Sequence, residues 1–282
     1  MEASSPTTAT VIESQRGWRA PNLREVWVYR DLLYFLARRD VVIRYKQAIV
    51  GVFWAVLQPL FIAGVFSVFL GLVLKLPAPE GIPFPLFAVT GMVMWLAFTN
   101  ALSAVTESTV ASEALISKIY FPRLVIPLSA VVPSAVDFAF SFAVLVLITL
   151  AYGVVPGAAA LTVPLIVILA LATALGAGLW LSALNVRYRD VHLLVPLLIL
   201  AGLFITPVIY AFETITAQVP EQVQILYALN PMVGVLEAFR WAMLGTDWPG
   251  ALLLIPFVSS IVLLITGAFF FHRAERTFAD VI

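Results

Sequence analysis

The chain has 282 residues, of which 62% are hydrophobic and only 11% are charged. Soluble domains average about 45–50% apolar and about 25% charged residues, so this composition indicates an integral membrane protein with several spans. The formal net charge is zero, which argues against nucleic-acid binding. Cysteine is absent, which excludes disulfides, cysteine nucleophiles and thiolate metal sites.

The first 48 residues contain no apolar run that resembles a signal peptide, so we expect the N-terminus to stay in the cytoplasm. Residues 1–20 are rich in Ser, Thr and Ala and are predicted to form a disordered tail. Residues 21–48 predict an amphipathic helix in the cytoplasmic interface, with Asn22 and Glu25 spaced as in a capping box. Its apolar face is expected to carry Val26, Tyr29, Leu33 and Leu36, and its opposite face Arg24, Asp31 and Arg38.

Six stretches are apolar and long enough to cross about 30 Å of hydrocarbon, which takes about 20 helical residues. They are 49–74, 86–106, 124–152, 163–184, 192–210 and 251–271. With the N-terminus inside, fourteen of the sixteen Lys and Arg fall on the cytoplasmic side, and only Lys75 and Arg240 lie outside. The positive-inside rule therefore predicts that both termini are cytoplasmic. The expected fold is an all-α integral membrane protein whose six transmembrane helices lie within residues 49–282.

The segment 211–250, between the fifth and sixth spans, contains a shorter helix. Asn230 can cap this helix, Pro231 can begin it and Gly245 can end it. A helix of about 14 residues is too short to span a bilayer, so we predict a re-entrant or interfacial helix on the outer side. Glu237 and Arg240 lie three residues apart on one of its faces.

Asp137 is the only acid deep inside a predicted span, and an intramembrane carboxylate is costly unless it is paired. Two interpretations stay open: a proton relay or substrate contact, or a hydrogen-bonded residue that holds helices together. The second is favoured, because a relay needs several ionisable partners and this chain has few.

Small residues recur every four positions at Ala170, Ala174, Gly178 and Ser182, which predicts a face where two helices pack closely. Aromatic residues near the ends of spans are typical of interfacial belts, and some can instead line a path for sugar rings. The residues considered as lining of such a channel are Trp54, Trp95, Phe98, Asn100 and Tyr210.

No catalytic or metal-binding constellation is present in the sequence. His192 and His272 lie in different segments without metal-ligand spacing, and no Gly-rich phosphate loop occurs, so the chain itself is not expected to be an enzyme or to bind ATP. A subunit of an exporter, a secondary transporter and a membrane scaffold all fit these observations.

Five stretches follow one another along the chain: "RDLLYFLARRDVVIRYKQAIVGVFWAVLQPL" (30–60), "GMVMWLAFTNAL" (91–102), "LISKIYFPRLVIPLSAV" (115–131), "TPVIY" (206–210) and "LNPMVGVLEAFR" (229–240). In this order and at these separations they resemble the permease subunits of the ABC exporters for polysaccharides and polyol phosphates, a family that includes O-antigen and teichoic-acid exporters. The nearest alternative is the permease of a related ABC exporter for drugs or simple lipids.

The resemblance implies a homodimeric pore in the bacterial cytoplasmic membrane, with two copies of a separate ATPase subunit docked beneath it. ATP and Mg²⁺ would be bound by that ATPase and no cofactor by this chain. The substrate would be a glycan on an undecaprenyl pyrophosphate carrier, among membrane lipids. The outer helix, with Asn230, Pro231, Glu237 and Arg240, would form an exit gate.

The resemblance also implies that residues 107–123 form the coupling loop on which the ATPase acts. The loop residues assigned to this role are Ser117, Lys118, Tyr120, Phe121, Pro122 and Arg123. Pro122 stiffens the loop, and Tyr120 and Phe121 would be anchors in a groove of the partner.

A cluster of basic residues, Arg38, Arg39, Arg44 and Lys46, ends just before the first span. Such a cluster attracts anionic headgroups at about 1 kcal/mol per charge, although simple positive-inside anchoring also accounts for it. Within the family that the motifs resemble, these residues would contact the pyrophosphate headgroup as the carrier enters, because Arg suits bidentate phosphate contacts.

Overall fold

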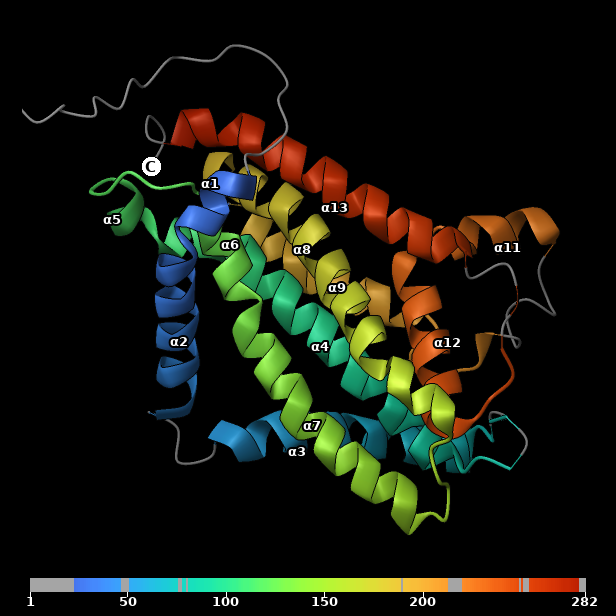
Figure 1. The fold of residues 1–282 in the computed structure, drawn as a ribbon. Coiled ribbons are helices and arrows are strands. Elements are labelled where there is room, and N and C mark those ends of the chain that lie inside the picture. The colour runs from blue at the N-terminus through green and yellow to red at the C-terminus, as the bar shows by residue number, and fades with distance from the viewer. Residues whose placement is uncertain are drawn as a thin grey trace, which may run out of the picture.

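The computed structural model describes residues 23–46, 51–75, 78–79, 81–188, 190–212, 220–248, 250 and 254–278, and these residues form helices and connecting turns without a strand (Figure 1). In chain order the helices are α1 (Leu23–Val28), α2 (Arg30–Lys46), α3 (Gly51–Phe66), the π-helix η1 (Ser67–Val73), α4 (Phe84–Ala111), α5 (Glu113–Ile116), α6 (Val125–Ala130), α7 (Val132–Ala151), the 3₁₀ helix η2 (Ala158–Thr162), α8 (Val163–Arg187), α9 (Val191–Ile205), α11 (Glu221–Ala228), α12 (Pro231–Leu244), α13 (Leu254–Ala274) and the 3₁₀ helix η4 (Glu275–Thr277).

Among the described residues, five helical stretches are long and apolar enough to cross a membrane: Phe53–Val73, Phe84–Ala111, Val125–Ala151, Ala158–Arg187 and Leu254–Ala274. They correspond to five of the six predicted spans, and the protein is therefore a helical membrane protein. The remaining apolar helix, α9, has 15 residues and a length of about 22 Å, which is less than the usual hydrocarbon thickness.

The predicted extent of the fifth span, 192–210, is wrong at its end. Helix α9 stops at Ile205, and Thr206 is extended, with φ −95° and ψ 143°. Pro207 follows, and a proline ring disfavours helical geometry in the residue before it. The stretch 206–210 is consequently not helical.

Helix α4 lies at the centre of the bundle, α8 packs against it, and α13 packs against α8 at the outer edge (Figure 1). These helices pack closely because the facing side chains are small. Gly178 of α8 lies against α4, where an added Cβ would be 2.5 Å from Val105, and Ser182 hydrogen-bonds Thr109 at 2.7 Å. On the other side of α8, an added Cβ at Gly267 of α13 would lie 2.3 Å from the carbonyl oxygen of Gly176. The predicted small-residue face of α8 is thus confirmed as a packing face.

Proline occupies the first turn of α4, α7, α8 and α12, where its missing N–H costs no helical hydrogen bond. Within the predicted span 124–152, helices α6 and α7 meet at Val131. Pro133 just beyond cannot donate to the carbonyl four residues earlier, which favours the break at this point.

Two expectations near the N-terminal half need correction. The interface helix predicted over 21–48 is divided into α1 and α2 at Tyr29, and Asn22 of its expected capping box lies outside the described residues. The coupling loop predicted over 107–123 is shorter, because 107–111 continue α4 and α5 follows Ser112.

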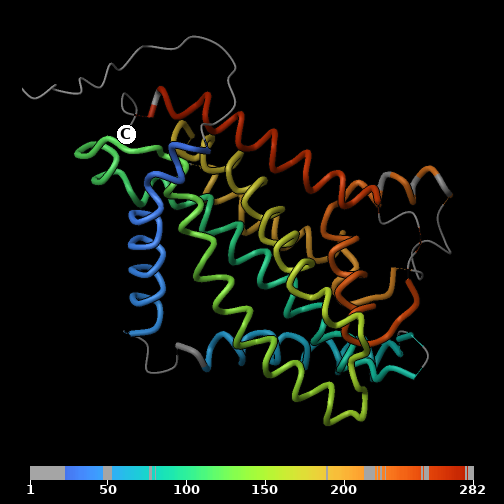
Figure 2. The backbone as a smooth tube through the Cα atoms, in the orientation of Figure 1, coloured from blue at the N-terminus to red at the C-terminus, as the bar shows by residue number. Residues whose placement is uncertain are grey.

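Helix α2 runs along one end of the bundle, from α1 beside α5 toward the start of α3, and packs against α6 and α7 (Figures 1 and 2). Its predicted apolar face is turned to the protein, with Leu36 only 3% exposed, and its polar face with Asp31 and Arg38 is exposed. The amphipathic pattern read from the sequence therefore describes the orientation of this helix correctly.

Candidate functional site

The end of the bundle where α2, α5 and α6 meet is held together by a small apolar cluster. Its buried members are Leu36, Ile116, Phe121, Val125 and Ile126, with Val26, Tyr29, Leu32, Leu33 and Leu115 packed around them. These residues come from α1, α2, α5, α6 and the loop 117–123, so the apolar face of α2 is fixed to the loop. We call this group the loop cluster.

The loop 117–123 surrounds a surface hollow of about 270 Å³, lined by Ile116, Ser117, Lys118, Ile119, Tyr120, Phe121 and Arg123. Five of the six residues predicted for ATPase coupling thus lie around one hollow, and Pro122 lies in the same loop. Tyr120 and Ile119 are 67% and 57% exposed, whereas Phe121 is 4% exposed within the loop cluster. Of the two aromatic residues expected to anchor a partner, only Tyr120 presents its ring to the surface.

Arg123 ties the loop to the C-terminal end of α13. It donates a hydrogen bond to the carbonyl oxygen of Glu275, and its guanidinium carbon lies 5.8 Å from the ring centroid of Phe278. Phe278 itself is buried against Phe271. In this structure Arg123 therefore contacts the chain itself rather than facing outward.

The four basic residues of α2 have different surroundings. Arg38 and Lys46 are exposed and form no ion pair with a described residue, whereas Arg39 pairs with the adjacent Asp40 at 2.8 Å. Arg39 and Arg44 both line a hollow of about 290 Å³ between α2, α4 and α6. Arg44 also makes the contact described next.

Asp137 lies in the second turn of α7 and is bound by the last turn of α2. Arg44 Nη2 is 2.5 Å from Asp137 Oδ2, and the hydroxyl of Tyr45 donates a short hydrogen bond to Asp137 Oδ1. The side chain of Asp137 is 8% exposed and that of Arg44 is 40% exposed. Burial and the hydrogen bond to Asp137 raise the pKa of Tyr45, so this phenol stays protonated and remains a donor. The favoured interpretation of Asp137, as a residue that links helices, agrees with these contacts.

A narrow cavity of about 50 Å³ lies beside this ion pair, between α3, α4 and α7. Arg44, Trp54, Asn100 and Asp137 line it together with Gln58 and Ser141. Ser141 donates to the carbonyl oxygen of Ala55 at 2.7 Å, which joins α7 to α3. The structure thus brings together one predicted headgroup residue, Arg44, and two predicted channel residues, Trp54 and Asn100.

The other predicted channel residues lie elsewhere. Trp95 is 4% exposed and packs against Phe98, with ring centroids 5.5 Å apart, and against Gly202 of α9. Tyr210 lies near α11, with its hydroxyl 2.9 Å from that of Tyr227. These three aromatic residues do not share the cavity that contains Trp54 and Asn100.

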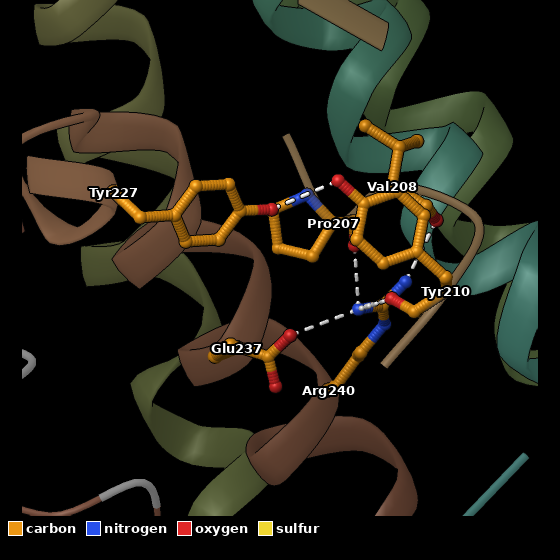
Figure 3. Close-up of polar contacts among 6 residues, drawn as sticks. All are labelled: Pro207, Val208, Tyr210, Tyr227, Glu237 and Arg240. Carbon is orange, nitrogen blue, oxygen red and sulfur yellow. Dashed lines mark hydrogen bonds and ion pairs between the residues drawn. The ribbon is translucent and has the colours of Figure 1, made fainter. Parts of the chain in front are cut away.

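Arg240 of α12 is completely buried and forms the centre of a polar cluster (Figure 3). Its guanidinium donates to the carbonyl oxygens of Pro207 and Val208 at 2.7 Å each and to Glu237 at 3.0 Å. The guanidinium carbon also lies 3.8 Å from the ring centroid of Phe87 in α4. Arg240 therefore supplies donors to the non-helical stretch 206–210, which packs directly on α12.

The predicted limits of α12 are confirmed. The side chain of Asn230 accepts a hydrogen bond from the N–H of Met232 at 3.0 Å, Pro231 is the first helical residue and Gly245 ends the helix with φ 70°. Asn230 also donates to Thr206 at 2.9 Å, so the cap of α12 is joined to the end of α9.

Sequence reasoning missed three residues of these sites. Tyr45 and Gln58 lie within the motif 30–60 but were assigned no role of their own, and Phe278 lies near the C-terminus, where no motif was recognised. The proximity of Tyr45 and Arg44 to Asp137 follows from the way α2 crosses α7, and helical spacing within either segment contains no signal for it.

The geometry defines a class of protein: a polytopic helical membrane protein with an amphipathic N-terminal helix, a loop fixed to that helix and buried charges between the helices. Residues 31–244 match the family described as ABC-2 type transporter, and the chain belongs to this family. The resemblance drawn from the motifs is thereby confirmed. Members of this family are permease subunits of ABC transporters, and membership implies pairing with an ABC ATPase.

Two relatives match almost the whole chain. The "O-antigen export system permease protein RfbA" of Klebsiella pneumoniae is 28% identical over 253 residues, which are 89% of this chain and 95% of that protein. The protein of the same description from Myxococcus xanthus is 29% identical over 261 residues, which are 92% of this chain and 98% of that protein.

Proposed function

We propose that this chain is the membrane-spanning subunit of an ATP-driven exporter that moves a lipid-linked polysaccharide, such as an O-antigen or teichoic acid, across the bacterial cytoplasmic membrane. The observation that carries the proposal is the similarity to O-antigen export permeases over about nine tenths of the chain. The chain is proposed to have no catalytic site of its own, and ATP and Mg²⁺ are assigned to the separate ATPase.

The proposed assembly contains two copies of this chain and two of the ATPase, with both termini in the cytoplasm. Fourteen of sixteen Lys and Arg favour this orientation. Helix α9 is proposed as a sixth, short span, and α11 and α12 as re-entrant helices on the outer side. The buried Arg240 supports this last point, because non-helical backbone at membrane depth requires internal hydrogen-bond donors such as those given to 206–210.

In the proposed mechanism the ATPase docks on the loop 117–123, with Tyr120 as the exposed anchor and Lys118 beside it. Because the loop cluster joins this loop to α2, movement of the loop also moves α2. The carrier headgroup approaches the basic residues of α2, namely Arg38, Arg39, Arg44 and Lys46. The glycan follows a path past Trp54 and Asn100, with Trp95 and Phe98 of α4 and Tyr210 of the non-helical stretch 206–210 at other points along it. It leaves by the gate formed by Asn230, Pro231, Glu237 and Arg240.

Reconstitution tests the proposal. The chain is purified with the ATPase that associates with it and placed in liposomes that contain a fluorescent polyprenyl-pyrophosphate-linked polysaccharide. We expect movement of the glycan across the bilayer with ATP and none with a non-hydrolysable ATP analogue. Transport that needs an ion gradient and no ATP would identify a secondary transporter, and ATP-dependent movement of a drug or simple lipid alone would identify another kind of ABC exporter.

A further inference from the structure

The cavity between α3, α4 and α7 has the size and lining of a site for one phosphate group. A single water needs a cavity volume of about 10–15 Å³. The cavity of about 50 Å³ therefore holds a group as large as a few waters. Trp54, Gln58 and Asn100, whose side chains carry N–H donors, line it together with Arg44 and its guanidinium. Neither the Gln58 nor the Asn100 amide forms a hydrogen bond to another described residue. Among the described residues that line the cavity, Asp137 is the only anion.

Asp137 forms with Arg44 the same kind of ion pair that an anionic ligand would form. A carboxylate and a phosphate form the same kind of ion pair with a guanidinium. The contact is made through Nη2, and the remaining nitrogens of Arg44 have no partner among the described residues. The Arg44 side chain is 40% exposed and lines both this cavity and the hollow between α2, α4 and α6. An anion can therefore reach Arg44 from the side of α2.

We propose that Arg44, with Gln58 and Asn100, binds a phosphate group of a lipid, and that this anion competes with Asp137 for the guanidinium. The inference rests on the proposed function and deepens it, because it assigns a binding site to the phosphate of the carrier. Exchange of Asp137 for phosphate on Arg44 leaves α2 attached to α7 at this point only through Tyr45. Because the other end of α2 is fixed to the loop cluster, the arrival of a headgroup is then communicated to the docking loop.

The experiment measures equilibrium binding to the purified complex in nanodiscs of phosphatidylcholine. The three probes are a fluorescent polyprenyl pyrophosphate, phosphatidylglycerol and inorganic pyrophosphate, which separate a lipid-borne phosphate from a free one. Asp137→Asn keeps the size of the side chain and removes the competing charge, so it should tighten binding of the polyprenyl pyrophosphate about tenfold, or about 1.4 kcal/mol. Arg44→Gln should weaken binding at least tenfold.

The double variant Arg44→Gln/Asp137→Asn decides whether the two residues act on each other. The gain from Asp137→Asn should disappear when Arg44 is absent, because competition requires the guanidinium. Asp31→Asn, an acid on the exposed face of the same helix, is the matched control and should leave binding unchanged. If Asp137→Asn impairs folding, Arg44→Lys supplies the second test: it keeps the charge, loses the planar fork and should weaken binding several-fold.

The outcomes distinguish this site from the proposed function. Tighter binding of phosphatidylglycerol by Asp137→Asn, without any binding of the polyprenyl pyrophosphate, would support the anion site and refute the proposed substrate class. ATP-driven glycan export together with unchanged or weaker binding of all three probes by a well-folded Asp137→Asn would overturn the site and leave the function in place. Stronger binding of free pyrophosphate than of either lipid would also contradict a lipid site.

Discussion

At the scale of single residues, Arg240 is a buried charged side chain on which several neighbouring groups depend for a hydrogen-bond donor. It is fully buried, and it satisfies the carbonyl oxygens of Pro207 and Val208 in addition to Glu237. Removal of one partner from a buried ion pair costs about 3–5 kcal/mol, because the other charge is left without compensation. The residue therefore contributes to the position of the stretch 206–210 as well as to α12.

Arg240→Met should lower the thermal unfolding midpoint of the detergent-solubilised protein strongly, since two buried backbone carbonyls lose a donor and Glu237 loses its ion pair with Arg240. Thermal unfolding followed by fluorescence-detected size exclusion measures the effect. Arg38→Met, which removes an exposed Arg with no described ion-pair partner, is the control and should change the midpoint little. Equal midpoints for the two variants would show that the buried guanidinium is not needed.

Gly91 of α4 faces the same cluster and tests how closely the backbones approach. An added Cβ would lie 2.0 Å from the carbonyl oxygen of Val208 and 2.8 Å from Arg240 Nη2, so Gly91→Ala should displace the stretch 206–210 and destabilise the protein. Gly64→Ala in α3 meets nothing within 4 Å and should be neutral or slightly stabilising, because Ala favours helix over Gly. The same unfolding assay compares the two, and a stable Gly91→Ala protein would contradict the close contact.

At the scale of elements, α2 and the loop 117–123 are packed together through the loop cluster. The two neighbouring aromatic residues of the loop have opposite surroundings, since Phe121 is buried and Tyr120 is exposed. Their substitutions are therefore expected to have different consequences, although the sequence suggested the same role for both.

Phe121→Ala should reduce stability by about 3 kcal/mol, as expected for a truncated buried aromatic ring, and should weaken ATPase binding only through the altered loop. Tyr120→Ala should leave the unfolding midpoint unchanged and weaken association with the ATPase about tenfold, because it removes an exposed anchor. Thermal unfolding and co-purification measure the two effects. A Tyr120→Ala chain that retains the ATPase normally would argue against docking at this loop.

Several elements follow from local signals in the sequence, and others depend on contacts that local signals do not contain. Asn230, Pro231 and Gly245 define the limits of α12 because capping and left-handed geometry are properties of a few adjacent residues. The pair Thr206 and Pro207 is also a local signal for the end of α9. The predicted span nevertheless continued to residue 210, because a membrane span was expected to be about 20 residues long. The contact of Arg44 with Asp137, and the inward position of Phe121, arise from packing between distant segments, so no helical period predicts them.

At the scale of the whole molecule, the proposed topology requires α9 to cross the membrane even though it is short. If it does not cross, the segment that contains α12 would lie on the same side as the loop 117–123. The two arrangements therefore differ in the side on which Asp247 is found.

The absence of native cysteine allows a direct test of this topology. Ser117→Cys and Asp247→Cys both place a thiol at an exposed position in an otherwise cysteine-free chain. A membrane-impermeant maleimide should label Asp247→Cys in intact spheroplasts and Ser117→Cys only in inverted vesicles. Labelling of both from the same side would refute six spans.

The dependence of the stretch 206–210 on Arg240 has a consequence for biogenesis. The carbonyl oxygens of Pro207 and Val208 receive their donors from a residue made more than thirty positions later, and unpaired carbonyls in hydrocarbon cost several kcal/mol each. If α9 spans the membrane as proposed, its end is consequently unstable in the lipid until α12 has been synthesised. Insertion of α9 and α12 is then a single late event, and a nascent chain stalled before residue 240 should still hold α9 within the insertion machinery.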